Sequence, residues 1–65
     1  MTARSNEADP LIAYVYGDTP PDFDAIAATG FDIVCLDSRA PWFRPSLIGQ
    51  AAQRGMLAVA HPMGP

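Results

Sequence analysis

The chain has 65 residues, a formal net charge of −3 and a single cysteine, so it forms at most one small domain without an internal disulfide. Its four basic residues are all arginines and are outnumbered by seven acidic residues, which leaves no basic stripe for nucleic acid. Its apolar runs are far shorter than the roughly 20 residues that cross a bilayer, so we expect no membrane contact and a cytoplasmic, reduced protein.

The first part of the chain divides into a polar leader and a strand. Residues 1–10 are polar, lack periodicity and end at Pro10, which predicts a disordered leader ahead of a domain that spans residues 11–65. Residues 11–16 form a continuous run of β-branched, aromatic and other apolar side chains, and Gly17 closes it. Such a run is typical of a strand that is buried on both faces.

A short helix is expected after this strand. Thr19 is a capping-type residue, a proline that follows it suits the first helical position, and Asp22 places a negative charge where the helix dipole favours it. Gly30 would supply the left-handed C-terminal cap. One apolar stripe at helical spacing marks the buried face, formed by Phe23, Ile26 and Ala27.

The second half of the chain repeats this order. Residues 31–36 predict a strand, and residues 39–45, with two prolines and two adjacent aromatic residues, predict an irregular loop. A helix is expected from Ser46 to a stop at Gly55, and residues 56–60 predict a third strand. The apolar face of this second helix would consist of Leu47, Ile48, Ala51 and Ala52.

The order β-α-β-α-β predicts an α/β fold with parallel strands joined by right-handed crossovers. The carboxyl ends of parallel strands meet at one edge of a sheet, where such folds bind ligands. That edge would collect Asp18, Asp37 and His61. Two carboxylates and an imidazole are suitable ligands for a divalent metal such as Mg²⁺ or Mn²⁺, and Asp37 with His61 would suit acid–base catalysis. Each of the three residues also has a structural reading, as a turn former or as part of a terminal segment.

The loop after the second strand offers candidate substrate-binding residues. Trp42 and Phe43 would stack on a sugar or another ring, anchor a partner, or simply cover the edge of the sheet. Arg39 and Arg44 flank them and would bind a carboxylate or phosphate, or remain solvated. Cys35 lies within an apolar run, which predicts an inert, buried thiol.

A longer pattern resembles a known enzyme family. Gly-Phe-Asp at residues 30–32 is followed by Asp37 and preceded by Ala-Ala at residues 27–28 and by an apolar strand. This pattern resembles the metal-dependent pyruvate aldolases, which comprise the 2,4-dihydroxyhept-2-enedioate aldolases and their citrate lyase β-chain relatives. The likeness covers residues 11–62 and implies the first three strands of a (β/α)8 barrel. It also implies cleavage or formation of a carbon–carbon bond next to a pyruvate enolate that a divalent metal holds.

The resemblance carries over only in part. Asp37 matches the family's acid at the end of the second strand. The Glu-His pair that follows in the family, whose His serves as the base, is replaced by Arg39 and Ala40. His61 stands where the family has a substrate-binding arginine, and the family's metal-binding carboxylates come from later strands. We therefore expect a fragment or subunit of a lyase-like barrel without independent catalysis.

Two alternatives remain open. A second likeness, to barrel glycosidases of the polygalactosaminidase type, predicts a carbohydrate-active barrel fragment and involves Tyr14, Gly17, Asp32 and Asp37. The other alternative is a small, non-enzymatic protein-interaction module. Three parallel strands cannot close a barrel, so one apolar sheet face would stay open. We therefore expect self-association or a partner chain that covers this face, and a small-molecule substrate only for the enzyme readings.

Overall fold

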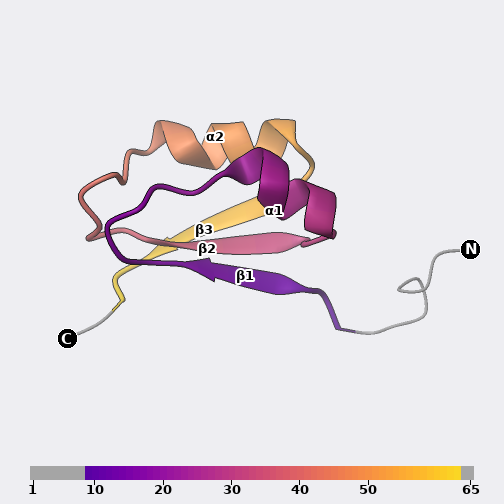
Figure 1. Ribbon diagram of the computed structural model, residues 1–65, viewed down its shortest axis with the longest axis horizontal. Helices are drawn as coiled ribbons and strands as arrows, with labels where there is room; N and C mark the ends of the chain where they lie inside the picture. The colour runs from indigo at the N-terminus through magenta and orange to yellow at the C-terminus, as the bar shows by residue number, and fades with distance from the viewer. Residues whose placement is uncertain (1–8, 64–65) are drawn as a thin grey trace, which may run out of the picture.

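The computed structural model describes residues 9–63 and confirms the predicted α/β fold (Figure 1). Its elements are strand β1 (Ile12–Val15), helix α1 (Phe23–Thr29), strand β2 (Ile33–Asp37), helix α2 (Ser46–Gln53) and strand β3 (Leu57–His61). The strands are parallel and lie in the order β1-β2-β3. Residues 1–8 of the predicted leader lie outside the described residues. No helix within residues 9–63 is long and apolar enough to cross a membrane.

Both helices cover the same face of the sheet, so the fold has two layers (Figure 1). Right-handed crossovers between neighbouring strands in sequential order place successive helices on one side. The core lies between these layers, where Val34 and Leu36 of the central strand are completely buried. Its buried members are Phe23, Val34, Leu36, Ala51 and Met56.

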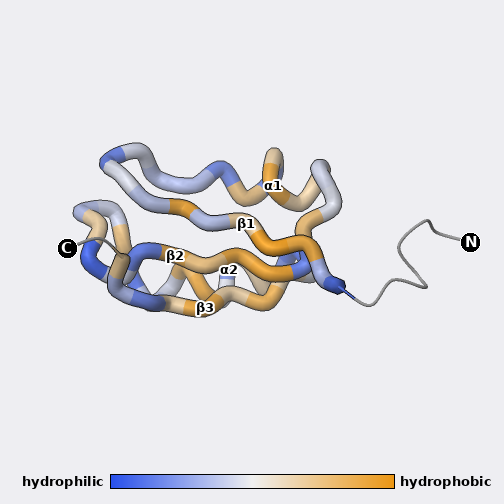
Figure 2. The backbone as a smooth tube through the Cα atoms, turned by 90° about the horizontal axis from the view of Figure 1, so that it is seen from below, coloured by the Kyte–Doolittle hydropathy of each residue, from blue (hydrophilic) through white to orange (hydrophobic). Residues whose placement is uncertain are grey.

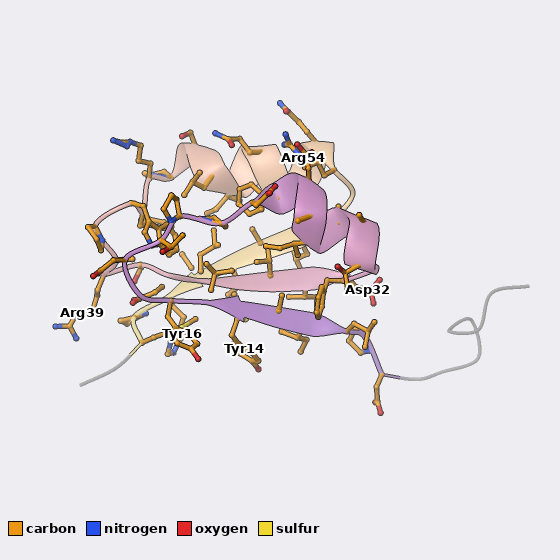
Figure 3. The ribbon with its side chains drawn as sticks, in the orientation of Figure 1. Tyr14, Tyr16, Asp32, Arg39 and Arg54 are labelled. Carbon is orange, nitrogen blue, oxygen red and sulfur yellow. The ribbon has the colours of Figure 1, made fainter. Side chains whose placement is uncertain are left out.

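Within residues 9–63, no layer covers the opposite side of the sheet, and we call this side the open face. Side chains alternate between the two faces of a strand, so β1 turns Tyr14 away from the helices, and Tyr16 follows on the same side (Figure 3). Tyr14 is 62% exposed and Tyr16 is 69% exposed. The expectation that the first strand is buried on both faces is therefore wrong. Figure 2 views the sheet from this side and shows the hydrophobic strands running across it.

Helix α1 begins later than the sequence suggested. Asp22, not Thr19, is the N-cap, and its Oδ1 accepts a hydrogen bond from the Ala25 amide at 3.2 Å. The reason is steric: a residue that precedes a proline is held in extended backbone, so the chain cannot enter a helix at the first residue of the Pro20-Pro21 pair. The predicted end is confirmed, because Gly30 adopts a left-handed conformation with φ of 100°.

Helix α2 buries a narrower stripe than predicted. Ala51 is completely buried and Leu47 packs against the core, as expected for residues four apart. Ile48 is 38% exposed, and Ala52 is exposed as well, so their predicted place in the buried face is wrong. Ile48 and Ala52 lie about 100° around the helix from Leu47 and Ala51, on a side of α2 that is exposed to solvent.

An ion pair connects the two helices. The Arg54 Nε, just past the end of α2, lies 2.6 Å from the Oδ1 of Asp24 in the first turn of α1. The Nη1 of Arg54 also donates to the carbonyl of Gln50 at 2.9 Å. Asp24 is 81% exposed in its side chain, so solvent screens the attraction and the pair contributes little to stability. Figure 3 shows Arg54 on the helical side of the molecule.

Asp32 organises the amino-terminal edge of the sheet (Figure 3). Its Oδ2 accepts a hydrogen bond from the Leu11 amide at 3.0 Å, and its own amide donates to the Leu11 carbonyl at 2.9 Å. Its carbonyl in turn accepts from the Leu57 amide at 3.0 Å. One residue before β2 thus aligns the beginnings of all three strands, which gives the Asp of the Gly-Phe-Asp pattern a structural role.

Candidate functional site

The carboxyl ends of the strands form one rim, and two of the predicted site residues meet there. Asp37 and His61 are the last residues of β2 and β3 and are partners in the parallel register. The Ser38 amide donates to the His61 carbonyl at 3.1 Å, which ties the two strand ends together. A carboxylate and an imidazole therefore lie on adjacent strands, at the edge where enzymes of this architecture carry their chemistry.

The Asp37 carboxylate has a structural task at this rim. Its Oδ1 accepts hydrogen bonds from the Arg39 amide at 3.0 Å and from the Met63 amide at 3.1 Å. The first bond closes the turn after β2, and the second holds the segment that follows β3. These two backbone donors occupy one carboxylate oxygen, Oδ1, of a half-buried side chain.

Asp18 does not join this pair in a metal centre. It is exposed and follows Gly17, whose φ of 90° turns the chain away after β1. Within residues 9–63, no group of three His, Cys, Asp or Glu side chains could hold a metal ion. Asp18, Asp37 and His61 are thus not gathered into a three-ligand group within the described residues, and metal binding remains a prediction.

Trp42 connects two loops of the rim. Its indole N–H donates to the Gly17 carbonyl at 2.9 Å, which links the loop after β2 to the loop after β1. The rings of Trp42 and Phe43 are half-buried and pack against the core. This arrangement favours the covering role over the sugar-stacking role, because the ring and its polar atom already have partners inside the protein.

The two arginines of this loop are exposed. Arg39 extends from the turn after β2 away from the sheet, as Figure 3 shows. Arg44 is exposed near the start of α2. Their roles in substrate binding therefore remain predictions.

The open face contains a shallow groove that the sequence reading missed. It has a volume of about 270 Å³ and is lined by Tyr14, Cys35, Val59, His61 and Met63. Tyr14, Cys35 and Val59 form one row across the three strands. Aligning the three apolar runs and taking every second residue would have revealed this row. Cys35 is only half-buried, so the expectation of a buried thiol is wrong.

Comparison with protein-family models, with curated proteins and with solved structures finds no match to this chain.

Proposed function

We propose that this chain is a non-catalytic assembly unit of the (β/α)-barrel type. It supplies three parallel strands and their carboxyl-end loops to a larger structure and binds the adjoining protein layer through its open face. The observation that supports this function is the one-sided covering of the sheet. Both helices lie on one face, while Tyr14 and Leu57, each 62% exposed, lie on the other.

The size of the exposed apolar surface supports this proposal. Five large side chains of the open face are between 38% and 69% exposed, namely Ile12, Tyr14, Tyr16, Leu57 and Val59. At about 200 Å² for a fully exposed side chain of this size, they present roughly 500 Å² to water. Burial at about 25 cal/mol per Å² would contribute at most about 12 kcal/mol. That is comparable to the whole stability of a small domain, so covering the face would decide whether the chain is firmly folded.

The rim supports a role without independent catalysis. The Asp37 carboxylate is bonded to two backbone amides, and Trp42 is bonded to the Gly17 carbonyl. A site for catalysis needs groups that are held in place yet available to a substrate. In the described residues, the polar groups of the rim mainly hold its loops to one another.

The experiment compares stability, exposed apolar surface and association. Thermal unfolding is followed by circular dichroism at several protein concentrations, and a hydrophobic dye such as ANS reports uncovered apolar surface. We expect a midpoint that rises with concentration and dye binding that falls as the chain associates. A monomer at micromolar concentration with a cooperative melt, a concentration-independent midpoint and no dye binding would contradict the proposed function.

A second candidate function is a lyase site that becomes complete in the larger barrel. The observation that favours it is the adjacency of Asp37 and His61 at the carboxyl ends of parallel strands. The test is release of pyruvate from a 4-hydroxy-2-oxo acid in the presence of Mn²⁺, for the wild type and for Asp37→Asn. Turnover that Asp37→Asn abolishes would support this candidate. Absence of turnover in the fully associated chain would count against it.

A further inference from the structure

We propose that the occupant of the open face is a second copy of this chain, packed sheet against sheet with the helices outside. This inference rests on the proposed assembly function and names its partner. The resulting dimer would have four layers, with two sheets about 10 Å apart in the middle. A two-fold axis between the sheets would make each copy bury the same residues, as an isologous interface requires.

The exposed area of the five large side chains is more than half of what each partner buries in an interface of standard size. The five large side chains of the open face present roughly 500 Å², against about 800 Å² per partner in an interface of standard size. Half-buried neighbours on the same side, Ile33, Cys35 and Met63, add to this area. The total accessible surface is 4340 Å², so the patch exceeds the share of about a tenth that such interfaces occupy on small proteins.

The rest of this sequence does not provide an apolar cover. Residues 1–8 read Met-Thr-Ala-Arg-Ser-Asn-Glu-Ala and contain one large apolar side chain, and residues 64–65 are Gly-Pro. Such segments cannot bury two tyrosines, a leucine and a valine.

The open face is complementary to itself when the second copy runs in the opposite direction. Charged and titratable groups lie at one end of the face, where Asp37 and His61 end their strands. Tyr16 lies near that end, whereas Ile12 and Leu57 share a row at the other end. Antiparallel placement would set Tyr16 over the aliphatic row of the partner, set Tyr14 over the middle row, and keep the two Asp37 carboxylates apart.

Cys35 provides a reporter at the centre of this interface. It lies in the middle of the central strand and lines the groove of the open face. In the dimer it would face the middle of the partner's central strand, and the partner would shield its thiol. Small thiol reagents would then react more slowly with Cys35 as the protein concentration rises.

The test measures the association constant by sedimentation equilibrium for the wild type and three variants. Tyr14→Lys and Val59→Lys place a charge within the open face, and Gln53→Lys places the same charge on the exposed side of α2. All three reduce the net negative charge equally, so general repulsion between copies falls in each. We expect a wild-type dimer at micromolar concentration, an unchanged Gln53→Lys dimer, and dimers at least about tenfold weaker for the open-face variants.

The possible outcomes separate this inference from the proposed function. A wild-type monomer that binds ANS would overturn the second copy and leave the assembly function standing. A wild-type monomer that binds no dye and melts cooperatively would overturn both. A dimer that both open-face substitutions leave unchanged would overturn the sheet-to-sheet arrangement. If circular dichroism shows these variants to be unfolded, the reaction rate of the Cys35 thiol in the wild type replaces them as the test. A rate that does not change with protein concentration would contradict the proposal.

Discussion

The indole N–H of Trp42 lies 2.9 Å from the carbonyl oxygen of Gly17 and donates a hydrogen bond to it. Two loops that are 25 positions apart in the sequence are thereby joined above the carboxyl ends of β1 and β2. The single tryptophan, which the sequence presented as a candidate for substrate stacking, connects parts of the scaffold. The contribution of this hydrogen bond to the free energy of unfolding can be measured by substitution.

Trp42→Phe would test this connection. The substitution keeps an aromatic ring against the core but removes the donor to Gly17, so we expect the free energy of unfolding to fall by about 1 kcal/mol. Urea unfolding followed by circular dichroism measures this value without relying on tryptophan fluorescence. The exposed neighbour Arg44 provides the control, because Arg44→Ala should change stability by less than about 0.5 kcal/mol. Equal stability of Trp42→Phe and the wild type would show that the bond contributes nothing.

Two glycines provide opposite predictions for the same substitution. Gly30 has a φ of 100° at the end of α1, so Gly30→Ala should lower stability by about 1 kcal/mol, although an added Cβ would meet no atom within 4 Å. Gly49 lies inside α2 with equally open space, and Gly49→Ala should raise stability by about 0.5 to 1 kcal/mol. Thermal unfolding of both variants measures the pair. Changes of the same sign would contradict this account.

Asp37→Ala should loosen the segment after β3. It removes the acceptor for the Arg39 and Met63 amides, and we expect a loss of about 1 to 3 kcal/mol in the free energy of unfolding. Asp37→Asn retains a carbonyl oxygen and should lose less. Hydrogen exchange of the Met63 amide is the local measurement and should accelerate in the alanine variant. The exposed Asp18 is the control, because Asp18→Ala should change neither stability nor this exchange rate appreciably.

Titration with Mg²⁺ or Mn²⁺ would examine the predicted metal site. We expect no saturable change in the NMR signals of the His61 ring at millimolar Mg²⁺, because residues 9–63 contain no group of three suitable ligands. With Mn²⁺, we expect no selective broadening at His61 beyond that at the exposed Asp24. Saturable binding that Asp37→Asn removes would restore the metal site.

The fold followed from features of the sequence that are local and repeated. Each strand is a short apolar run, and Gly30 and Gly55, both with positive φ, stand where the helices were expected to end. The alternation of these elements implied parallel strands, because a helix between two strands brings the second back in the same direction. The prediction of Thr19 as the cap of α1 is wrong because Pro21 holds the backbone of Pro20 in an extended conformation, so the helix begins after both prolines.

The site was harder to predict because a sequence does not show which side of a strand is covered. The run at residues 11–16 would look the same in a fully buried strand and in β1, whose Tyr14 faces water. The sequence did place Asp37 and His61 at one edge, since strand order and direction determine that position. It could not show that backbone amides bind the Asp37 carboxylate, because the Met63 amide is 26 positions away and approaches only through the path of the segment after β3.

The hydrogen bonds between Asp32 and Leu11 have a consequence for how β1 finds its place. Sliding β1 by two residues along β2 would preserve the inward and outward alternation of side chains, so the apolar pattern alone tolerates several alignments. Only one alignment brings the Leu11 amide to the Asp32 carboxylate and its carbonyl to the amides of Asp32 and Ile33. The hydrogen bonds of Asp32 therefore select one register of β1 against β2 among the several that the apolar pattern alone would allow.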